Sequence, residues 1–161
     1  MKQFSIAAVL LLTLLITLAA CQTNRMTQRT STEIPADFSL TIQRTGCRGR
    51  CPIYQLSIDY TGQVVYTGER FTDLTGTYEK KLETAQLLAV VKYLDEKQFW
   101  AMDSVYDQPG VMDVPAVTVA STSGGRTHQV RARFNVPEEV VTFYEQLEVL
   151  IGPAGYTKRE E

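Results

Sequence analysis

Two cysteines that enclose only three residues are the feature that most constrains the fold of this chain. Cys47 and Cys51 flank Gly49, and Pro52 follows directly. Glycine tolerates the tight backbone of a short corner, whereas proline fits poorly inside a helix or a central strand. The cysteine pair therefore predicts a tight corner that a covalent bond could close, between two extended segments.

The residues on both sides of this corner alternate between apolar and polar, which is typical of strands with one buried face. Before the corner, the apolar residues Leu40 and Ile42 fall on one face of the expected strand, and the polar Thr41 falls on the opposite face. After it, the same alternation continues up to a turn signal at Thr61-Gly62. The expected strands cover residues 38–43, 54–60, 63–67 and 77–82.

The period then changes to that of a helix. Thr84 is a suitable N-cap, and apolar residues recur at helical spacing up to about residue 97. Two further strands, over residues 114–121 and 126–134, flank a hairpin turn at Ser123-Gly124-Gly125. Pro137 opens a final helix that ends at Gly152-Pro153. Its apolar stripe consists of Val140, Tyr144, Leu147 and Ile151.

The element order is therefore ββββαββα, which predicts an α+β fold. We expect a two-layer sandwich: an antiparallel sheet of about five to six strands, with two helices on one face. An apolar content of 44% is sufficient for one core. The expected domain covers residues 37–152, and residues 153–161 form a polar tail.

The first twenty residues predict the compartment. Residues 1–20 combine a positive start, an uncharged apolar run and small residues at the end, as a secretory signal peptide does. Cys21 directly follows Leu18-Ala19-Ala20 and resembles the cysteine of a bacterial lipobox. This resemblance implies that Cys21 carries acyl chains such as palmitate. Within residues 21–36, the segment after Cys21 is polar and shows neither a helical nor a strand period, which predicts a flexible tether to the membrane.

The residue after the lipobox cysteine indicates in which membrane we expect the protein. The usual signal that retains a lipoprotein in the inner membrane resembles an Asp directly after the lipobox cysteine, and this chain has Gln22 at that position. We therefore expect the outer membrane, facing the periplasm, if the source has two membranes. A net charge of −2 gives no general attraction to nucleic acid. An envelope protein or a glycan is the expected partner besides the membrane.

Assigning Cys21 to lipid leaves Cys47 and Cys51 as a pair in an oxidising compartment, which favours a structural disulfide. A thiol redox site is an alternative, because Arg44 and the neighbouring arginines would lower the pKa of a free thiol. Copper handling is another, since two sulfurs and the imidazole of His128 suit that metal. We expect no cofactor and no catalytic set.

With Gly49, Pro52 and Tyr54, the cysteine pair reads C-x-G-x-C-P-x-Y. In this motif the chain resembles a family of bacterial envelope lipoprotein domains of unassigned function. A D-x-P element at residues 113–115 and the helix after Pro137 also fit, so the resemblance extends over residues 38–151. It implies no reaction and no ligand.

Several arginines are candidates for binding an anionic headgroup or glycan. They are Arg48, Arg50, Arg126, Arg131 and Arg133. The aspartates between residues 103 and 113 lack the spacing of a calcium loop. The sequence therefore predicts a lipid-anchored envelope protein that acts as a non-catalytic binding or structural module, with the thiol redox or copper-handling protein as the alternative.

Overall fold

The computed structural model describes residues 33–160. The expected signal peptide, Cys21 and most of the expected tether lie outside the described residues, so these assignments stay predictions. Within residues 33–160, neither helix combines the length and the apolar content that a membrane span requires.

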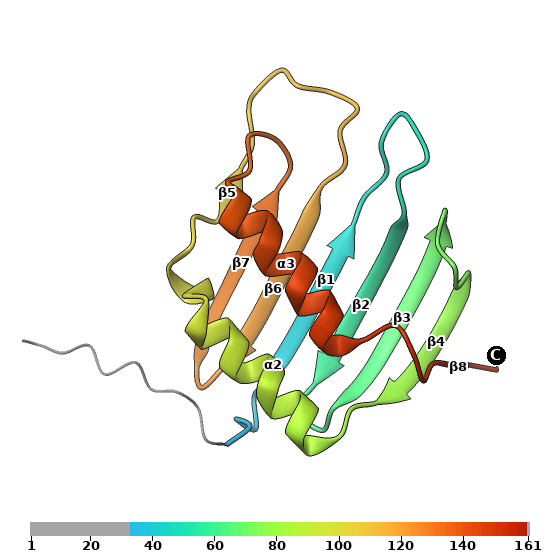
Figure 1. The fold of residues 1–161 in the computed structure, drawn as a ribbon, viewed down its shortest axis with the longest axis vertical. Coiled ribbons are helices and arrows are strands. Elements are labelled where there is room, and N and C mark those ends of the chain that lie inside the picture. The colour runs from blue at the N-terminus through green and yellow to red at the C-terminus, as the bar shows by residue number, and fades with distance from the viewer. Residues whose placement is uncertain (1–32, 161) are drawn as a thin grey trace, which may run out of the picture.

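The chain forms an α+β fold around one open sheet (Figure 1). The spatial order of the strands is β5-β7-β6-β1-β2-β3-β4-β8. In chain order the strands are β1 (Ser39–Arg44), β2 (Ile53–Asp59), β3 (Gln63–Arg70), β4 (Gly76–Lys81), β5 (Val105–Tyr106), β6 (Val117–Ser123), β7 (Arg126–Ala132) and β8 (Thr157–Lys158).

Two short edge strands correct the expected sheet. The six longer strands pair antiparallel, as expected, but β5 pairs parallel with β7 and β8 pairs with β4. The sheet is therefore mixed and has eight strands instead of five or six. Each added strand has only two residues, and β8 lies within the segment expected as a polar tail.

Alternation along the strands separates a buried face from a polar one. Leu40 and Ile42 on β1 are buried and pair in register with Ile58 and Leu56 on β2. Between them, Thr41 belongs to the opposite face, where polar side chains predominate. The apolar face therefore needs a covering layer.

Two helices supply that layer, because α2 (Thr84–Glu96) and α3 (Glu138–Ile151) lie on the same face of the sheet (Figure 1). A short helical turn, η1 (Phe99–Ala101), follows α2. The N-cap of α2 is Glu83 and not the expected Thr84, which is already the first residue of the helix.

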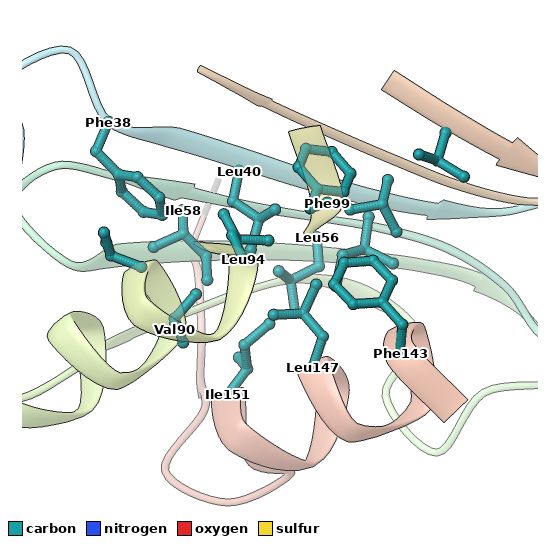
Figure 2. Close-up of a cluster of buried hydrophobic side chains, with 14 of the residues drawn as sticks. Phe38, Leu40, Leu56, Ile58, Val90, Leu94, Phe99, Phe143, Leu147 and Ile151 are labelled. Atoms are coloured by element: carbon teal, nitrogen blue, oxygen red, sulfur yellow. The ribbon is translucent and has the colours of Figure 1, made fainter. Parts of the chain in front are cut away.

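The core lies between these two layers (Figure 2). Leu147 and Ile151 from α3 and Leu94 from α2 are fully buried against the sheet. In the apolar stripe of α3, Phe143 takes the buried place expected for Tyr144, and its ring stacks on that of Phe99 with centroids 5.6 Å apart. Tyr144 is instead half-buried at the side of the core.

The hairpin between β6 and β7 forms at the expected glycines. Gly124 and Gly125 have φ values of 60° and 75°, a conformation that glycine adopts without strain. Their N–H groups donate to the carboxylate of Asp37 over 2.8 and 2.7 Å, and these bonds lower the pKa of Asp37. Asp37 therefore ties the hairpin to the segment that leads into β1.

Candidate functional site

A pocket of about 700 Å³ lies on the helix-bearing face of the sheet, beside the C-terminal part of α3. Its walls come from β1, β2 and β3, the loop after β3, the end of α3 and the segment before β8. The side chains used below are Tyr54, Tyr66, Tyr156, Phe71, Asp73 and Glu145, and we call this hollow the tyrosine pocket. A second hollow, of about 690 Å³ at the β4–β8 edge, is lined by Gly76, Thr77 and residues 158–160 and has no aromatic wall.

Three polar side chains from distant parts of the chain form one wall of the tyrosine pocket. Arg44 and Tyr54 are partners in the β1–β2 register and continue the inward-facing series of both strands. Glu148 reaches them from α3. Arg44 donates through Nε and Nη2 to the two carboxylate oxygens of Glu148, over 2.9 and 2.8 Å. Bidentate geometry of this kind is among the strongest that an arginine and a carboxylate can form.

The hydroxyl of Tyr54 completes this cluster. It accepts a hydrogen bond from Nε of Arg44 over 3.0 Å and donates to Oε1 of Glu148. Burial, followed by the hydrogen bond and charge of Glu148, raises the pKa of Tyr54. Burial alone would lower the pKa of Arg44, but Glu148 more than offsets this and raises it. At neutral pH the cluster is thus a charged pair closed by a neutral phenol.

A row of tyrosine rings continues from this cluster across the pocket. The ring centroids of Tyr54 and Tyr66 are 5.2 Å apart, and those of Tyr66 and Tyr156 are 5.6 Å apart. Burial raises the pKa of Tyr66, and burial together with Tyr66 raises the pKa of Tyr156 to about 12. The row therefore presents uncharged aromatic surface at physiological pH.

The rim of the tyrosine pocket is apolar and exposed. Phe71 is 49% exposed and Val149, on the α3 side, is 66% exposed. Phe71 also has a φ of 57°, which is unfavourable for a bulky residue. Strained residues of this kind concentrate at functional sites. A large ring held exposed in such a conformation favours contact with another molecule.

Lys80 fixes the end of α3 beside the pocket. Its Nζ donates to the carbonyl oxygens of Ile151, Gly152 and Ala154 and lies 4.4 Å from the ring centroid of Tyr156. Carbonyl groups at a helix C-terminus otherwise lack partners, and a cation there is favourable. Lys80 therefore connects α3, β4 and the tyrosine row.

The disulfide corner lies next to this wall. Cys47 and Cys51 are bonded, with their Cα atoms 5.7 Å apart, and Pro52 lines the tyrosine pocket. The N–H of Arg48 donates to the carbonyl oxygen of Asp113 over 3.3 Å, so the corner contacts the expected D-x-P element. Gly49 does not have a positive φ, so backbone conformation does not explain this glycine.

The structure does not bring His128 together with the two cysteines. His128 pairs with Ser121, which pairs with Leu40, whereas the cysteines lie beyond the other end of β1. Nε2 of His128 is 2.9 Å from the carbonyl oxygen of Met102. Among residues 33–160, no three His, Cys, Asp or Glu side chains are placed to hold a metal ion.

Three of the five candidate arginines for anion binding are paired closely with carboxylates. Arg126 binds Asp95, and both Arg131 and Arg133 bind Asp107, all over 2.8 to 2.9 Å. Burial opposes ionisation of Asp107, but hydrogen bonds from Arg133, the backbone of Gln108 and Arg131 lower its pKa.

The other two candidates lie on the disulfide corner. Arg48 is 3.9 Å from Asp113, and the Arg50 guanidinium lies 5.7 Å from the ring centroid of Phe71. The five arginines do not form one cluster. Even the two on β7 are far apart, because Arg126 is the first residue of this strand and Arg131 lies near its end.

Sequence reasoning missed most of the tyrosine pocket. The sequence places Arg44 beside the cysteines and Tyr54 both in the motif and at the start of an expected strand, but it does not connect the two. No local pattern marks Glu148, Tyr66 or Tyr156 as site residues. The available signal was that Arg44 and Tyr54 occupy inward-facing positions of their strands, where a buried charge requires a partner.

Comparison with known proteins gives a family and no function. No curated protein matches the chain. A protein-family model described as a domain of unknown function (DUF6438) matches residues 38–151, which include β1 through α3 and every wall of the tyrosine pocket except residues 152–156. The match covers well over half of the chain, and the protein therefore belongs to this family of domains of unknown function, DUF6438.

Proposed function

We propose that this protein is a lipid-anchored envelope module that binds a partner or ligand in the tyrosine pocket. The observation that carries the proposal is the pocket itself: a row of aromatic rings with an exposed apolar rim at Phe71 and Val149. Large exposed apolar groups beside a concave aromatic surface favour association, because binding removes them from water.

The Arg44–Tyr54–Glu148 cluster supports a binding role for the pocket in preference to catalysis by these three side chains. Arg44, Tyr54 and Glu148 use their hydrogen-bonding atoms on one another. A general acid or base needs a proton-transfer atom directed at a substrate. Here the cluster instead stabilises a wall, and the exposed rim supplies the contact surface.

The binding role predicts that a bulky residue at the rim blocks the pocket. Val149→Trp should reduce recovery of the partner from the native envelope by the full chain at least about tenfold, because an indole beside Phe71 occupies the entrance. Val149 is exposed, so the change should leave the fold intact. Quantitative co-purification after crosslinking in the envelope measures the effect.

Gln146→Trp is the matched control, because Gln146 is exposed on the same helix but does not line the pocket. It should retain the partner. Equal recovery by both tryptophan variants, at the level of the unchanged protein, would reject the tyrosine pocket as the binding site.

The anchoring role predicts complete loss of membrane attachment in Cys21→Ser. Each buried CH₂ group contributes roughly 0.8 kcal/mol, so removing all acyl chains leaves no anchor. Fatty-acid labelling should disappear and the protein should move to the soluble fraction. The double variant Cys47→Ser, Cys51→Ser should keep its label. Undiminished labelling of Cys21→Ser would refute lipid attachment at this residue.

A further inference from the structure

We infer that the tyrosine pocket takes an organic cation, an alkylammonium or guanidinium group, in contact with its aromatic rings and acidic rim. This inference rests on the proposed binding function and adds the chemical class of the ligand. The same group can come from a lysine or arginine side chain of a partner polypeptide or from a free amine. The experiment below distinguishes these two sources.

The first support is two carboxylates of the pocket, Asp73 and Glu145, that take part in no ion pair among residues 33–160. The pocket lining contains one cation, Arg44, and the carboxylates of Asp73, Glu145 and Glu148. Arg44 neutralises Glu148. Asp73 and Glu145 are exposed, and neither forms an ion pair within residues 33–160. An incoming cation would therefore meet two carboxylates that no arginine or lysine of the described chain already binds.

The second support is the aromatic lining. The face of a phenol or phenyl ring is negative and attracts a cation that lies within about 6 Å of the centroid. Tyr54, Tyr66 and Tyr156 form a continuous row at the base, and Phe71 stands at the rim. Aromatic rings beside carboxylates provide both the electrostatic and the apolar contacts that an alkylated cation requires.

The protein already uses these rings in this way. Nζ of Lys80 lies 4.4 Å from the centroid of Tyr156, and the Arg50 guanidinium lies 5.7 Å from that of Phe71. Lys80 is held by three carbonyl oxygens near the end of α3, so its charge is fixed in place. Arg50 is exposed and approaches from the disulfide corner. It therefore competes with an external cation for Phe71.

This competition separates the inference from anion binding. If the pocket takes a cation, removing the positive charge of Arg50 should strengthen binding, because it frees the ring of Phe71 and increases the local negative charge. If Arg50 instead binds an anionic headgroup or glycan, the same change should weaken binding. One variant therefore gives opposite results under the two hypotheses.

The experiment titrates the full chain, in detergent micelles, with small probes. N-acetyl-lysinamide, N-acetyl-argininamide and choline are the cationic probes, and N-acetyl-norleucinamide is the neutral probe. Binding is followed by the NMR shifts of labelled tyrosine rings. We expect a cationic probe to shift these signals at concentrations at least about tenfold below those that the neutral probe needs.

Three variants test the contacts. Removing both rim carboxylates, by Asp73→Asn with Glu145→Gln, should weaken cation binding about tenfold. Arg50→Gln should strengthen it about threefold. Glu96→Gln is the control, because Glu96 is an exposed carboxylate at the end of α2 that does not line the pocket, and it should change nothing.

The probes also identify the source of the cation. Binding of the two amides without choline indicates a primary ammonium or guanidinium group of the kind that a lysine or arginine side chain carries, whereas binding of choline, with or without the amides, indicates that a free quaternary amine is accepted. The inference is overturned if the neutral probe binds as tightly as the cationic ones, if Arg50→Gln weakens binding, or if no probe shifts the tyrosine signals. In each of these cases, loss of partner recovery in Val149→Trp would still support the proposed binding function.

Discussion

Gly68→Ala is expected to lower the free energy of unfolding by about 3 kcal/mol, at the upper end of the range for overpacking. A Cβ at this position would lie 1.9 Å from the carbonyl oxygen of Leu74 and 2.7 Å from Oγ1 of Thr72. The nearer atom belongs to the backbone and cannot rotate away. Gly68 has no positive φ, so the close approach alone requires glycine here. Denaturant unfolding of the full chain measures the change.

Gly49→Ala is the matched control for this prediction. Gly49 also lacks a positive φ, and a Cβ there would meet only Sγ of Cys47 at 3.7 Å, an ordinary contact. Its stability should therefore change by no more than about 0.5 kcal/mol. Because Thr72 and Leu74 line the tyrosine pocket, Gly68→Ala should also shift the signals of the nearby tyrosine rings. Equal stability of the two alanine variants would contradict the predicted clash.

Glu148→Gln is expected to cost about 2 kcal/mol of stability. The change leaves the charge of Arg44 without its bidentate partner, in a place where both side chains are only 23% and 24% exposed. Removing one member of a fully buried pair costs about 3–5 kcal/mol, and partial exposure reduces this. Unfolding in urea at neutral pH measures the loss.

Two further variants show whether the loss comes from the unpaired charge. The double variant Arg44→Met, Glu148→Gln should recover part of the stability, because it removes the cation that Glu148→Gln leaves behind. Arg48→Gln should cost less than about 0.5 kcal/mol, since Arg48 and Asp113 are 87% and 57% exposed and 3.9 Å apart. The interpretation fails if Glu148→Gln is no more harmful than Arg48→Gln.

The sequence predicts the main layers of this fold because their signals are local. Alternation around Leu40 and Leu56 and the helical stripe containing Leu147 depend only on neighbours within a few residues. The strands β5 and β8 are too short to show any period, so the sequence could not predict them. Helical spacing alone likewise did not distinguish Phe143 from Tyr144 as the buried aromatic residue of α3.

The tyrosine pocket could not be predicted in the same way, because it depends on contacts between distant segments. Arg44 and Glu148 are 104 residues apart, and Tyr54 joins them only through the register of β1 and β2. The cysteine pair could be recognised from the sequence because both cysteines lie within five residues of each other. Local patterns therefore revealed the corner beside the pocket but not the pocket itself.

The direction of β1 has a consequence for an acylated form of this protein. The chain enters the sheet at Ser39, and Arg44 at the other end of this strand, about 17 Å away, forms part of the pocket wall. A lipid attached at Cys21 would therefore be connected to the domain at the Ser39 end of β1, opposite to the end that carries Arg44. The wall at Arg44 would then be separated from the point where the chain enters the sheet by the whole length of β1.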